Sequence, residues 1–245
     1  MNRWRVDTSM DDDPDKKRSA GKPRPLAVVS DCTSTIGYDC CRMLARDGYN
    51  LLVIGDDHEK VVRQSDILRD AFGINIRRIV ADIRDQESLS MVENALENNN
   101  RNIDVLICNT GVTPPNFADS SFKQILDLII HQLNTSIRFT RSVLPGMQIN
   151  NSGSIIFIVS VFYMPPSLES ILLSTASVYL STLSRSLKGE LFKRGSKIEV
   201  RTICPGLKYS SVQGDGNSGL TGFISGNVRD LNYDLERLWP AVPNI

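Results

Sequence analysis

The chain alternates short apolar runs with longer stretches in which apolar residues recur at helical spacing. The short runs are rich in Val, Ile and Leu, which is typical of strands covered on both faces, and they lie at 26–30, 51–55, 76–81, 104–108, 154–160 and 199–204. The helical stretches between them lie at 36–47, 58–72, 85–98, 120–144 and 171–192. This alternation predicts an α/β domain built on a parallel sheet.

Both ends of the chain lack this alternation. Residues 1–24 contain the acidic run DDDPD followed by KKRSAGKPRP, and we expect a disordered polar leader there. Residues 207–245 are rich in Gly, Ser and Asn and include one short helical pattern. We expect them to form a flexible loop and a short C-terminal helix of the same domain, whose main part spans 25–206.

Composition argues against several classes of protein. With 28 basic and 28 acidic residues the net charge is zero, so neither nucleic acid nor an anionic membrane is an expected partner. No apolar run approaches the roughly 18 residues of a membrane span, and we expect a cytoplasmic protein. The five cysteines show no CxxC spacing and are expected to be buried thiols. The two histidines, His58 and His131, do not indicate a metal site.

Residues 153–192 carry the most informative motif, a strand GSIIFIVS followed by a short loop and an amphipathic helix. Together with VLPGM at 143–147 and SRSLKGEL at 184–191, this stretch resembles the short-chain dehydrogenase/reductase family. It is similar in particular to the branch of very-long-chain 3-oxoacyl-CoA reductases and 17-beta-hydroxysteroid dehydrogenases. The resemblance covers about 25–210 and implies a single doubly wound Rossmann-type parallel sheet with helices on both faces.

The resemblance also implies a catalytic centre of Asn, Ser, Tyr and Lys, whose positions in this chain hold Gln132, Ser160, Leu173 and Ser177. In the family the Tyr passes a proton to the substrate and the Lys lowers the pKa of that Tyr. Leucine has no proton to give and serine carries no permanent charge, so only Ser160 matches. We therefore do not expect hydride transfer by the family mechanism, although Tyr163 stands as an alternative proton donor.

The turn after the first strand reads T-G-x-x-x-G-I-G in the family, and its glycines let the backbone approach the cofactor's pyrophosphate. Here Ser30 stands for the Thr, Asp31 for the first Gly and Thr35 for the second, while Gly37 is kept. A carboxylate at Asp31 repels phosphates, and the side chain of Thr35 adds bulk. The other interpretation is an ordinary turn whose polar residues cap the following helix.

The remaining cofactor positions are interpreted as vestiges of the family site. Asp56, at the end of the second strand, can accept hydrogen bonds from an adenosine ribose, whereas an Arg would suit a 2′-phosphate. We expect no cofactor, and NAD(H) in preference to NADP(H) if one binds. The vestigial positions are Ser30, Gly37, Asp56, Asp82, Asn109, Gly111, Pro205 and Gly206.

The helices expected at 120–144 and 171–192 carry wide apolar stripes. The stripe of the first includes Ile125, Ile129, Leu133 and Ile137. The stripe of the second consists of Leu172, Ala176, Tyr179, Leu183, Leu187 and Leu191, with Leu173 and Leu180 outside it. In the family the equivalent helices pair with a partner subunit, so we expect a homodimer or a heterodimer through these two helices.

Three functions remain open. The chain is a catalytically inactive relative that acts as a binding or dimerising module, or an NAD(P)-dependent oxidoreductase that reduces a ketone of a steroid or fatty-acyl substrate with displaced catalytic groups, or a folded copy that has lost its function. The joint loss of Tyr, Lys, Asn and two glycines favours the first. The fold and Ser160 support the second.

Overall fold

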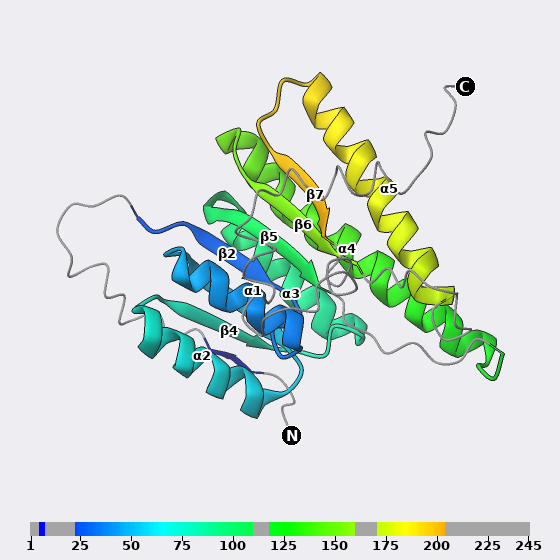
Figure 1. Ribbon diagram of the computed structural model, residues 1–245, viewed down its shortest axis with the longest axis horizontal. Helices are drawn as coiled ribbons and strands as arrows, with labels where there is room; N and C mark the ends of the chain where they lie inside the picture. Colours follow the sequence, from blue (N-terminus) through cyan, green and yellow to red (C-terminus); the bar gives the residue numbers. More distant parts are fainter. Residues whose placement is uncertain (1–4, 8–22, 110–117, 160–170, 204–245) are drawn as a thin grey trace, which may run out of the picture.

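A seven-stranded sheet forms the centre of the computed structural model, which describes residues 5–7, 23–109, 118–159 and 171–203 (Figure 1). The strand order is β1-β4-β3-β2-β5-β6-β7, and the six strands from β2 to β7 run parallel. The strands are β1 (Arg5–Asp7), β2 (Leu26–Val29), β3 (Asn50–Gly55), β4 (Ile76–Val80), β5 (Ile103–Asn109), β6 (Ser154–Ile158) and β7 (Glu199–Ile203). All six predicted strands are present.

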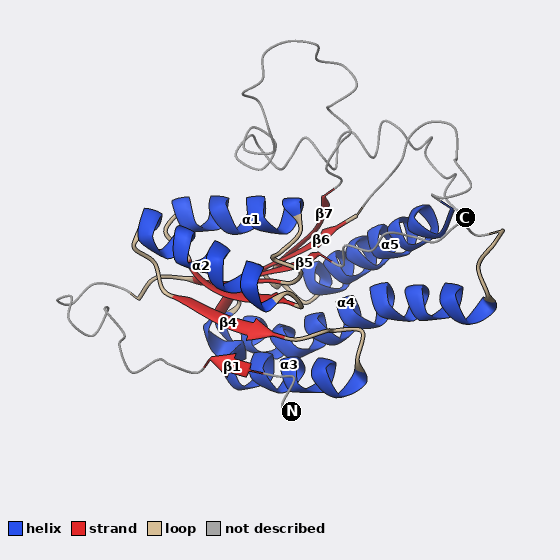
Figure 2. Cartoon of the chain, turned by 90° about the horizontal axis from the view of Figure 1, so that it is seen from below, coloured by secondary structure: helices blue, strands red, loops and turns tan. Residues whose placement is uncertain are grey.

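Helices cover both faces of this sheet, as predicted. Figure 2 shows α1 and α2 on one face and α3, α4 and α5 on the other. The helices are α1 (Thr35–Arg46), α2 (His58–Phe72), α3 (Gln86–Asn99), α4 (Phe122–Asn150) and α5 (Ile171–Lys193), with a short 3₁₀ turn, η2, at Asn100–Asn102. The doubly wound α/β fold is therefore confirmed. Among the described helices, none combines the length and apolarity needed to cross a bilayer.

Polar residues begin the helices that follow the strands. The side chains of Ser34, Asp57 and Asp85 each accept a hydrogen bond from a backbone N–H in the first turn of α1, α2 and α3. Such caps satisfy N–H groups that have no partner inside the helix. The caps also fix the segments that lead from β2 to α1, from β3 to α2 and from β4 to α3. Because the three strands are parallel, these segments lie at one edge of the sheet.

Helix α4 is longer than the predicted 120–144, because it continues through Pro145 and Gly146 to Asn150. A Cβ atom added to Gly146 would lie 2.2 Å from the backbone oxygen of Asn100 in η2. Glycine therefore allows the close packing of α4 on η2, while the buried Met147 in the next position holds the helix on the sheet. Proline and glycine are unfavourable within a helix, and packing outweighs that cost here.

Strand β1 was not predicted, because it lies in the range expected to form a polar leader. It pairs antiparallel with β4, with Arg5 opposite Val80, Val6 opposite Ile79 and Asp7 opposite Arg78. Three residues are too few for a period-two pattern to stand out from the surrounding sequence. This strand adds a seventh, antiparallel member to the parallel sheet.

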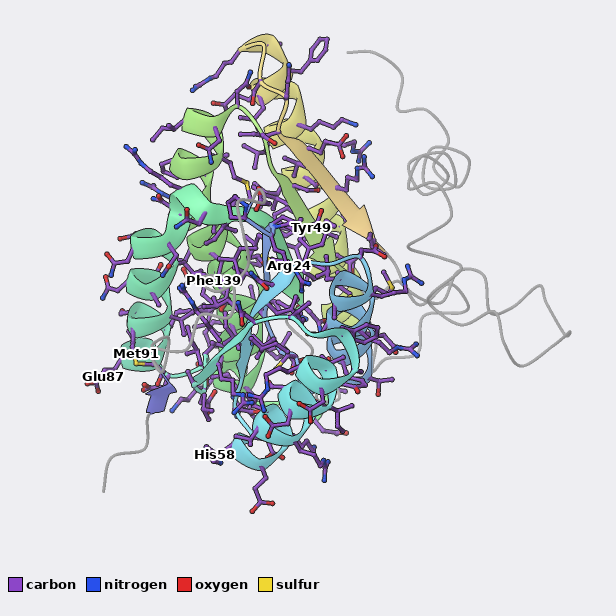
Figure 3. The ribbon with its side chains drawn as sticks, turned by 90° about the vertical axis from the view of Figure 1, so that its left-hand side faces the viewer. Arg24, Tyr49, His58, Glu87, Met91 and Phe139 are labelled. Atoms are coloured by element: carbon purple, nitrogen blue, oxygen red, sulfur yellow. The ribbon has the colours of Figure 1, made fainter. Side chains whose placement is uncertain are left out.

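The core lies between the sheet and its helices, and Phe139 of α4, labelled in Figure 3, is among its fully buried side chains. Cys32, Cys40, Cys41 and Cys108 are free and buried, as predicted, and Cys204 lies outside the described residues. Burial raises the pKa of Cys32, Cys40 and Cys108 to about 12. These thiols are therefore neutral packing groups at physiological pH.

Helix α5 faces the sheet through most of the predicted stripe, with one exchange of neighbouring residues. Leu180, placed outside the stripe, is buried with 3% of its surface exposed, whereas Tyr179, placed within it, is 40% exposed. Ala176 and Leu191 are buried as expected, and Leu183 and Leu187 pack against the core. The expectation is therefore wrong for Leu180 and Tyr179, because Leu180 lies on the same helix face as Ala176, Leu183, Leu187 and Leu191, at intervals of three or four residues.

Candidate functional site

The candidate site lies at the carboxyl ends of β2, β3, β4 and β5. In open α/β sheets ligands bind at this edge, where the strand order reverses between neighbouring strands. From β2 the chain adds β3 and β4 on one side, and it then crosses over to add β5, β6 and β7 on the other side. The reversal of strand order therefore falls between β2 and β5. The polar residues brought to this edge are Ser30, Asp31, Asp56, Asp82 and Asn109.

Asn109 at the end of β5 ties the turn after β2 in place. Its backbone N–H donates to Ser30 Oγ at 2.8 Å, and Ser30 Oγ donates to the backbone oxygen of Asn109 at 2.8 Å. The Asn109 side chain donates to Ser34 Oγ at 2.8 Å and to the backbone oxygen of Asp31 at 3.4 Å. The turn is thus fixed between two strands and the start of α1.

The backbone of this turn has the form that glycine adopts most easily. Asp31 has φ = 49°, in the left-handed region. A Cβ atom added to Gly37 would lie 2.1 Å from the backbone oxygen of Asp31, so only glycine fits where the helix packs on the turn. Ser34 caps α1 by accepting from the backbone N–H of Gly37 at 3.1 Å. The turn thus combines a left-handed backbone at Asp31 with a close contact to α1 at Gly37.

Burial, together with the nearby carboxylate of Asp56, raises the pKa of Asp31 from 3.8 to about 6. Hydrogen bonding from Ser34 and Thr33 opposes this shift, since Thr33 Oγ1 lies 3.4 Å from Asp31 Oδ1. The carboxyl group is therefore held where its charge is poorly solvated. At neutral pH it remains largely ionised, and in mild acid it becomes neutral.

A second group of charges surrounds Arg84, in the loop after β4. Arg84 Nε and Nη2 donate to the two oxygens of Asp82 at 2.8 and 3.0 Å, and Nη2 also lies 3.4 Å from Asp56 Oδ2. Burial raises the pKa of Asp82, but the hydrogen bonds and charge of Arg84 outweigh it, so the pKa is lowered. One cation thus links the ends of β3 and β4.

His131 of α4 lies beside this group. Burial lowers its pKa, and the charge of Arg84 lowers it further, while Asp82 acts in the opposite direction. Its Nδ1 is buried and has no hydrogen-bond partner among the described residues. His58, the other histidine, begins α2, is exposed, and points away from the sheet in Figure 3. The described residues include no group of three or more His, Cys, Asp or Glu suited to a metal ion.

The expected catalytic positions are only partly visible. Gln132 on α4 and Ser177 on α5 are buried, and Gln132 Oε1 has no hydrogen-bond partner within the part of the chain that the structure describes. Leu173 lies in the first turn of α5, but its side chain lies outside the described part of the structure. Ser160 and Tyr163 fall outside the described residues, as do the cofactor positions Gly111, Pro205 and Gly206. Whether these residues meet at one centre therefore stays a prediction.

Sequence reasoning missed Arg84 and the position of His131. The signal for Arg84 was present, since an Arg follows Asp82 by two residues in a loop that leads from a strand to a helix cap. The contact between Arg84 and Asp56 was not predictable in the same way, because 28 residues separate them and the register of β3 on β4 brings them together.

Comparison with known proteins places this arrangement in context. Residues 25–219 match the family model described as short chain dehydrogenase. The chain is 27% identical over 214 residues to a probable NADP-dependent dehydrogenase from Haemophilus influenzae, covering 84% of this chain and 81% of that one. It is also 27% identical over 195 residues to inactive hydroxysteroid dehydrogenase-like protein 1 from Rattus norvegicus, covering 78% of this chain. The chain spans only 58% of that relative's length.

Two solved structures have the same fold. A bulky-bulky ketone specific alcohol dehydrogenase from Comamonas testosteroni aligns with a TM-score of 0.73 and 23% identity, over 91% of this chain and 98% of that one. A short-chain dehydrogenase from Sphingobium yanoikuyae in complex with NADPH aligns with a TM-score of 0.68 and 25% identity, over 74% of this chain and 70% of that one.

These findings overturn the expectation of no cofactor, and of NAD(H) before NADP(H). One relative is named as NADP-dependent, and one neighbour was solved with NADPH bound. The expectation rested on Asp56 as an unpaired acid, but its carboxylate lies 3.4 Å from the guanidinium of Arg84. It also rested on the lost glycine at Asp31, yet the backbone there keeps a left-handed conformation. Neither position therefore supports the original inference.

Proposed function

Because the chain belongs to the short-chain dehydrogenase family, we propose that it is a catalytically inactive member that keeps an NADP(H)-type site and acts by binding. The observation that carries this proposal lies on α5. Ser177, at the position of the family's lysine, is 4% exposed and uncharged. By the spacing of the motif, Leu173 then occupies the position of the proton donor, one helical turn earlier.

The chemistry of the two positions supports inactivity. NADP(H), when bound, supplies or accepts a hydride at carbon, and a carbonyl oxygen that gains charge in this step needs a proton. A positioned general acid is typically worth roughly 10²- to 10⁴-fold in rate. Leu173 has no titratable proton, and Ser177 cannot lower the pKa of a neighbour by charge. The described residues thus offer binding groups without this acid.

Several described residues suit an NADP(H)-type ligand. The N-terminus of α1, capped by Ser34 and approached closely at Gly37, can face phosphate. Asp82 and Arg84 offer an acceptor and a fork of donors at the adenosine end. Asn109 holds the turn in place. This cradle accounts for a retained binding role.

The alternative is an oxidoreductase that acts on a ketone of a steroid or fatty-acyl substrate through displaced groups. The match to a probable NADP-dependent dehydrogenase over 81% of that protein's length favours it. The decisive measurement is oxidation of NADPH, followed by absorbance, with a panel of ketone substrates. We expect no turnover above the rate without protein, and turnover by the unmodified chain would favour this alternative.

A paired variant makes this test sharper. We expect Leu173→Tyr combined with Ser177→Lys to gain measurable NADPH oxidation, because it restores a proton donor and a cation four residues apart. The matched control, Leu173→Phe with Ser177→Lys, has similar bulk but no hydroxyl and should stay inactive. Equal rates for the two double variants would show that proton donation at residue 173 does not limit the reaction.

The binding role extends to a second copy of the chain. On α4, Phe122 is 78% exposed, and Leu126 and Ile130 follow at intervals of four residues and are also exposed. On α5, Val178 and Tyr179 are exposed, and the two helices lie beside one another in both Figure 1 and Figure 2. Apolar side chains gathered on adjoining helices favour burial against another subunit.

A further inference from the structure

We propose that the groove between α5 and the outer edge of β7 binds an acidic peptide segment of another protein, which adds to the sheet as a strand. The groove lies at the end of the sheet opposite β1, whereas the candidate nucleotide site lies at the carboxyl ends of β2 to β5. Figure 1 shows α5 beside β7 at this end of the molecule. The two sites are therefore separate, and a peptide can bind here whether or not a nucleotide binds.

The groove has the shape of a site along a strand edge. Its volume is about 440 Å³, and its walls are α5 and residues 196–201. Val200 and Arg201 both line it, although neighbouring side chains of a strand point to opposite faces of the sheet. The groove therefore passes around the outer edge of β7. On the wall formed by α5, a Cβ atom at Gly189 would meet nothing within 4 Å, so this wall is open to a partner.

The backbone of β7 offers hydrogen bonds along this edge. Among the described strands, β7 pairs only with β6. The backbone N–H of Glu199 donates to the backbone oxygen of Gly153, so the backbone groups of Glu199 face β6. Backbone groups of successive residues point to opposite sides of a strand, and those of Val200 and Thr202 therefore point to the outer edge. An extended peptide can pair with them and so lengthen the sheet by one strand.

The side chains around the groove indicate the charge of the partner. Of the ten lining residues one is an acid, Glu199, and four are cations, namely Arg185, Lys188, Lys197 and Arg201. Arg201 pairs with Glu199, while the other three cations form no ion pair with any described residue. The whole chain has zero net charge, so this positive surface is local. It attracts a partner that carries carboxylates.

The same cations argue against a second copy of the chain as the occupant. Pairing of two β7 edges would bring Lys197 and Arg201 close to the same cations of the other copy, and like charges across a strand pair repel. The groove also has an apolar part, because Phe192, which is 81% exposed, and the buried Ile198 line it. A segment in which acidic and apolar residues alternate fits both kinds of side chain.

The test uses two synthetic peptides of alternating Glu and Val. One has an ordinary backbone, and the other carries a methyl group on every amide nitrogen, so that it has the same charge but cannot donate to a strand edge. Each peptide carries a fluorescent label and is titrated against the full chain by anisotropy. We expect the ordinary peptide to bind, and the methylated one to bind at least about tenfold more weakly. Equal affinities would overturn the addition of a strand.

Two charge reversals distinguish binding in the groove from general attraction. Lys188→Glu places an acid in the groove and should weaken binding of the ordinary peptide by about tenfold or more. Lys193→Glu is the matched control, because Lys193 is a cation of the same helix outside the groove, and it should leave the affinity nearly unchanged. Both lysines are exposed, so both variants should keep the fold. An equal loss of affinity in the two variants would overturn the proposal.

Other occupants of the groove give different results. If another part of the same chain fills the edge of β7, the full chain binds neither peptide, and the proposal is wrong. If the surface binds a membrane instead, the chain binds vesicles that contain phosphatidylserine but not the peptides, and Phe192→Glu abolishes the vesicle binding. That result would also overturn the proposal. Neither result changes the proposed function, because no nucleotide takes part in these measurements.

Discussion

Asp31 has a backbone conformation that glycine adopts most easily. Its carboxylate is a charged group, which is unfavourable when buried and repels a nearby phosphate. The residue adopts φ = 49° because the turn requires it, and the turn places the carboxyl group partly out of solvent beside Asp56. Aspartate tolerates the left-handed region better than most residues do. The chain therefore keeps the shape of the turn at the expense of a poorly solvated charge.

This charge predicts a dependence of stability on pH. The pKa of Asp31 is about 6 in the folded chain and 3.8 when unperturbed, so the folded state binds the proton more tightly. The stability that protonation gives is present below pH 3.8 and is lost as the pH rises through about 6. We expect Asp31→Asn to stabilise the chain at pH 7.5 by about 1 to 3 kcal/mol more than at pH 4.

Urea unfolding of the two proteins between pH 4 and pH 8 measures this difference. Asp85→Asn is the control, because the backbone hydrogen bond from Ser88 lowers the pKa of Asp85. The control should change stability with pH in the opposite sense. If Asp31→Asn has the same effect at both pH values, then Asp31 is not desolvated in the folded state.

The position of a site residue was predictable where residues close to it in sequence determine that position. The turn residues Ser30, Asp31 and Gly37 were located from the strand that precedes them, and Asp31 was correctly identified as a carboxylate in that turn. The pairing of Asp56 with Arg84 depends on the register of two strands. A single sequence does not contain that register, so the cofactor preference inferred from Asp56 alone was wrong.

At the scale of elements, two glycines within helices differ in whether packing requires them. Gly146 of α4 and Gly189 of α5 are both in helices, where glycine is unfavourable relative to alanine. A Cβ at Gly146 would meet backbone atoms of Asn100 at 2.2 and 2.3 Å, while a Cβ at Gly189 would meet nothing within 4 Å. Only the first glycine is required by the fold.

The two positions therefore make a matched pair for mutation. We expect Gly146→Ala to destabilise the chain by about 1 to 3 kcal/mol, because α4 must move away from η2. Gly189→Ala should stabilise it by about 0.5 to 1 kcal/mol through the helix propensity of alanine. Denaturant midpoints give both values. Equal effects at the two sites would contradict the close contact between α4 and η2.

Element positions were predictable and element orientations were not. Periodicity located α5 to within one residue at each end, but it placed Tyr179 rather than its neighbour Leu180 on the buried face. Adjacent residues differ by about 100° around a helix, and a stripe wide enough to include both does not fix the rotation. Contact with the sheet decides it.

For the whole molecule, the exposed apolar side chains of α4 and α5 predict self-association. We expect a dimer in sedimentation at micromolar concentration, with twice the 27.3 kDa mass of the chain. Val178→Glu should produce the monomer without loss of folding, because Val178 is exposed in the single chain. Leu180 is unsuitable for this test, since it is buried in the core.

Ile67→Glu on α2 is the matched control, because Ile67 is equally exposed but lies on the opposite face of the sheet. It should leave the dimer intact. A monomer in the unmodified chain, or a loss of the dimer in both variants, would rule out association through α4 and α5.

The architecture of the whole sheet was predictable, because parallel strands that are buried on both faces have continuous apolar sequences. Strand β1 was not, since it is short and is defined only by its partner β4. It pairs residue 5 with residue 80, so 75 positions of chain separate the two strands. During synthesis β1 is made before β4, so it stays without this partner until β4 has formed.

An open strand edge accepts other strands, including those of neighbouring chains. In the folded chain β1 covers the outer edge of β4. The edge that β1 itself presents is only three residues long, and so short an edge strand limits pairing with neighbouring chains.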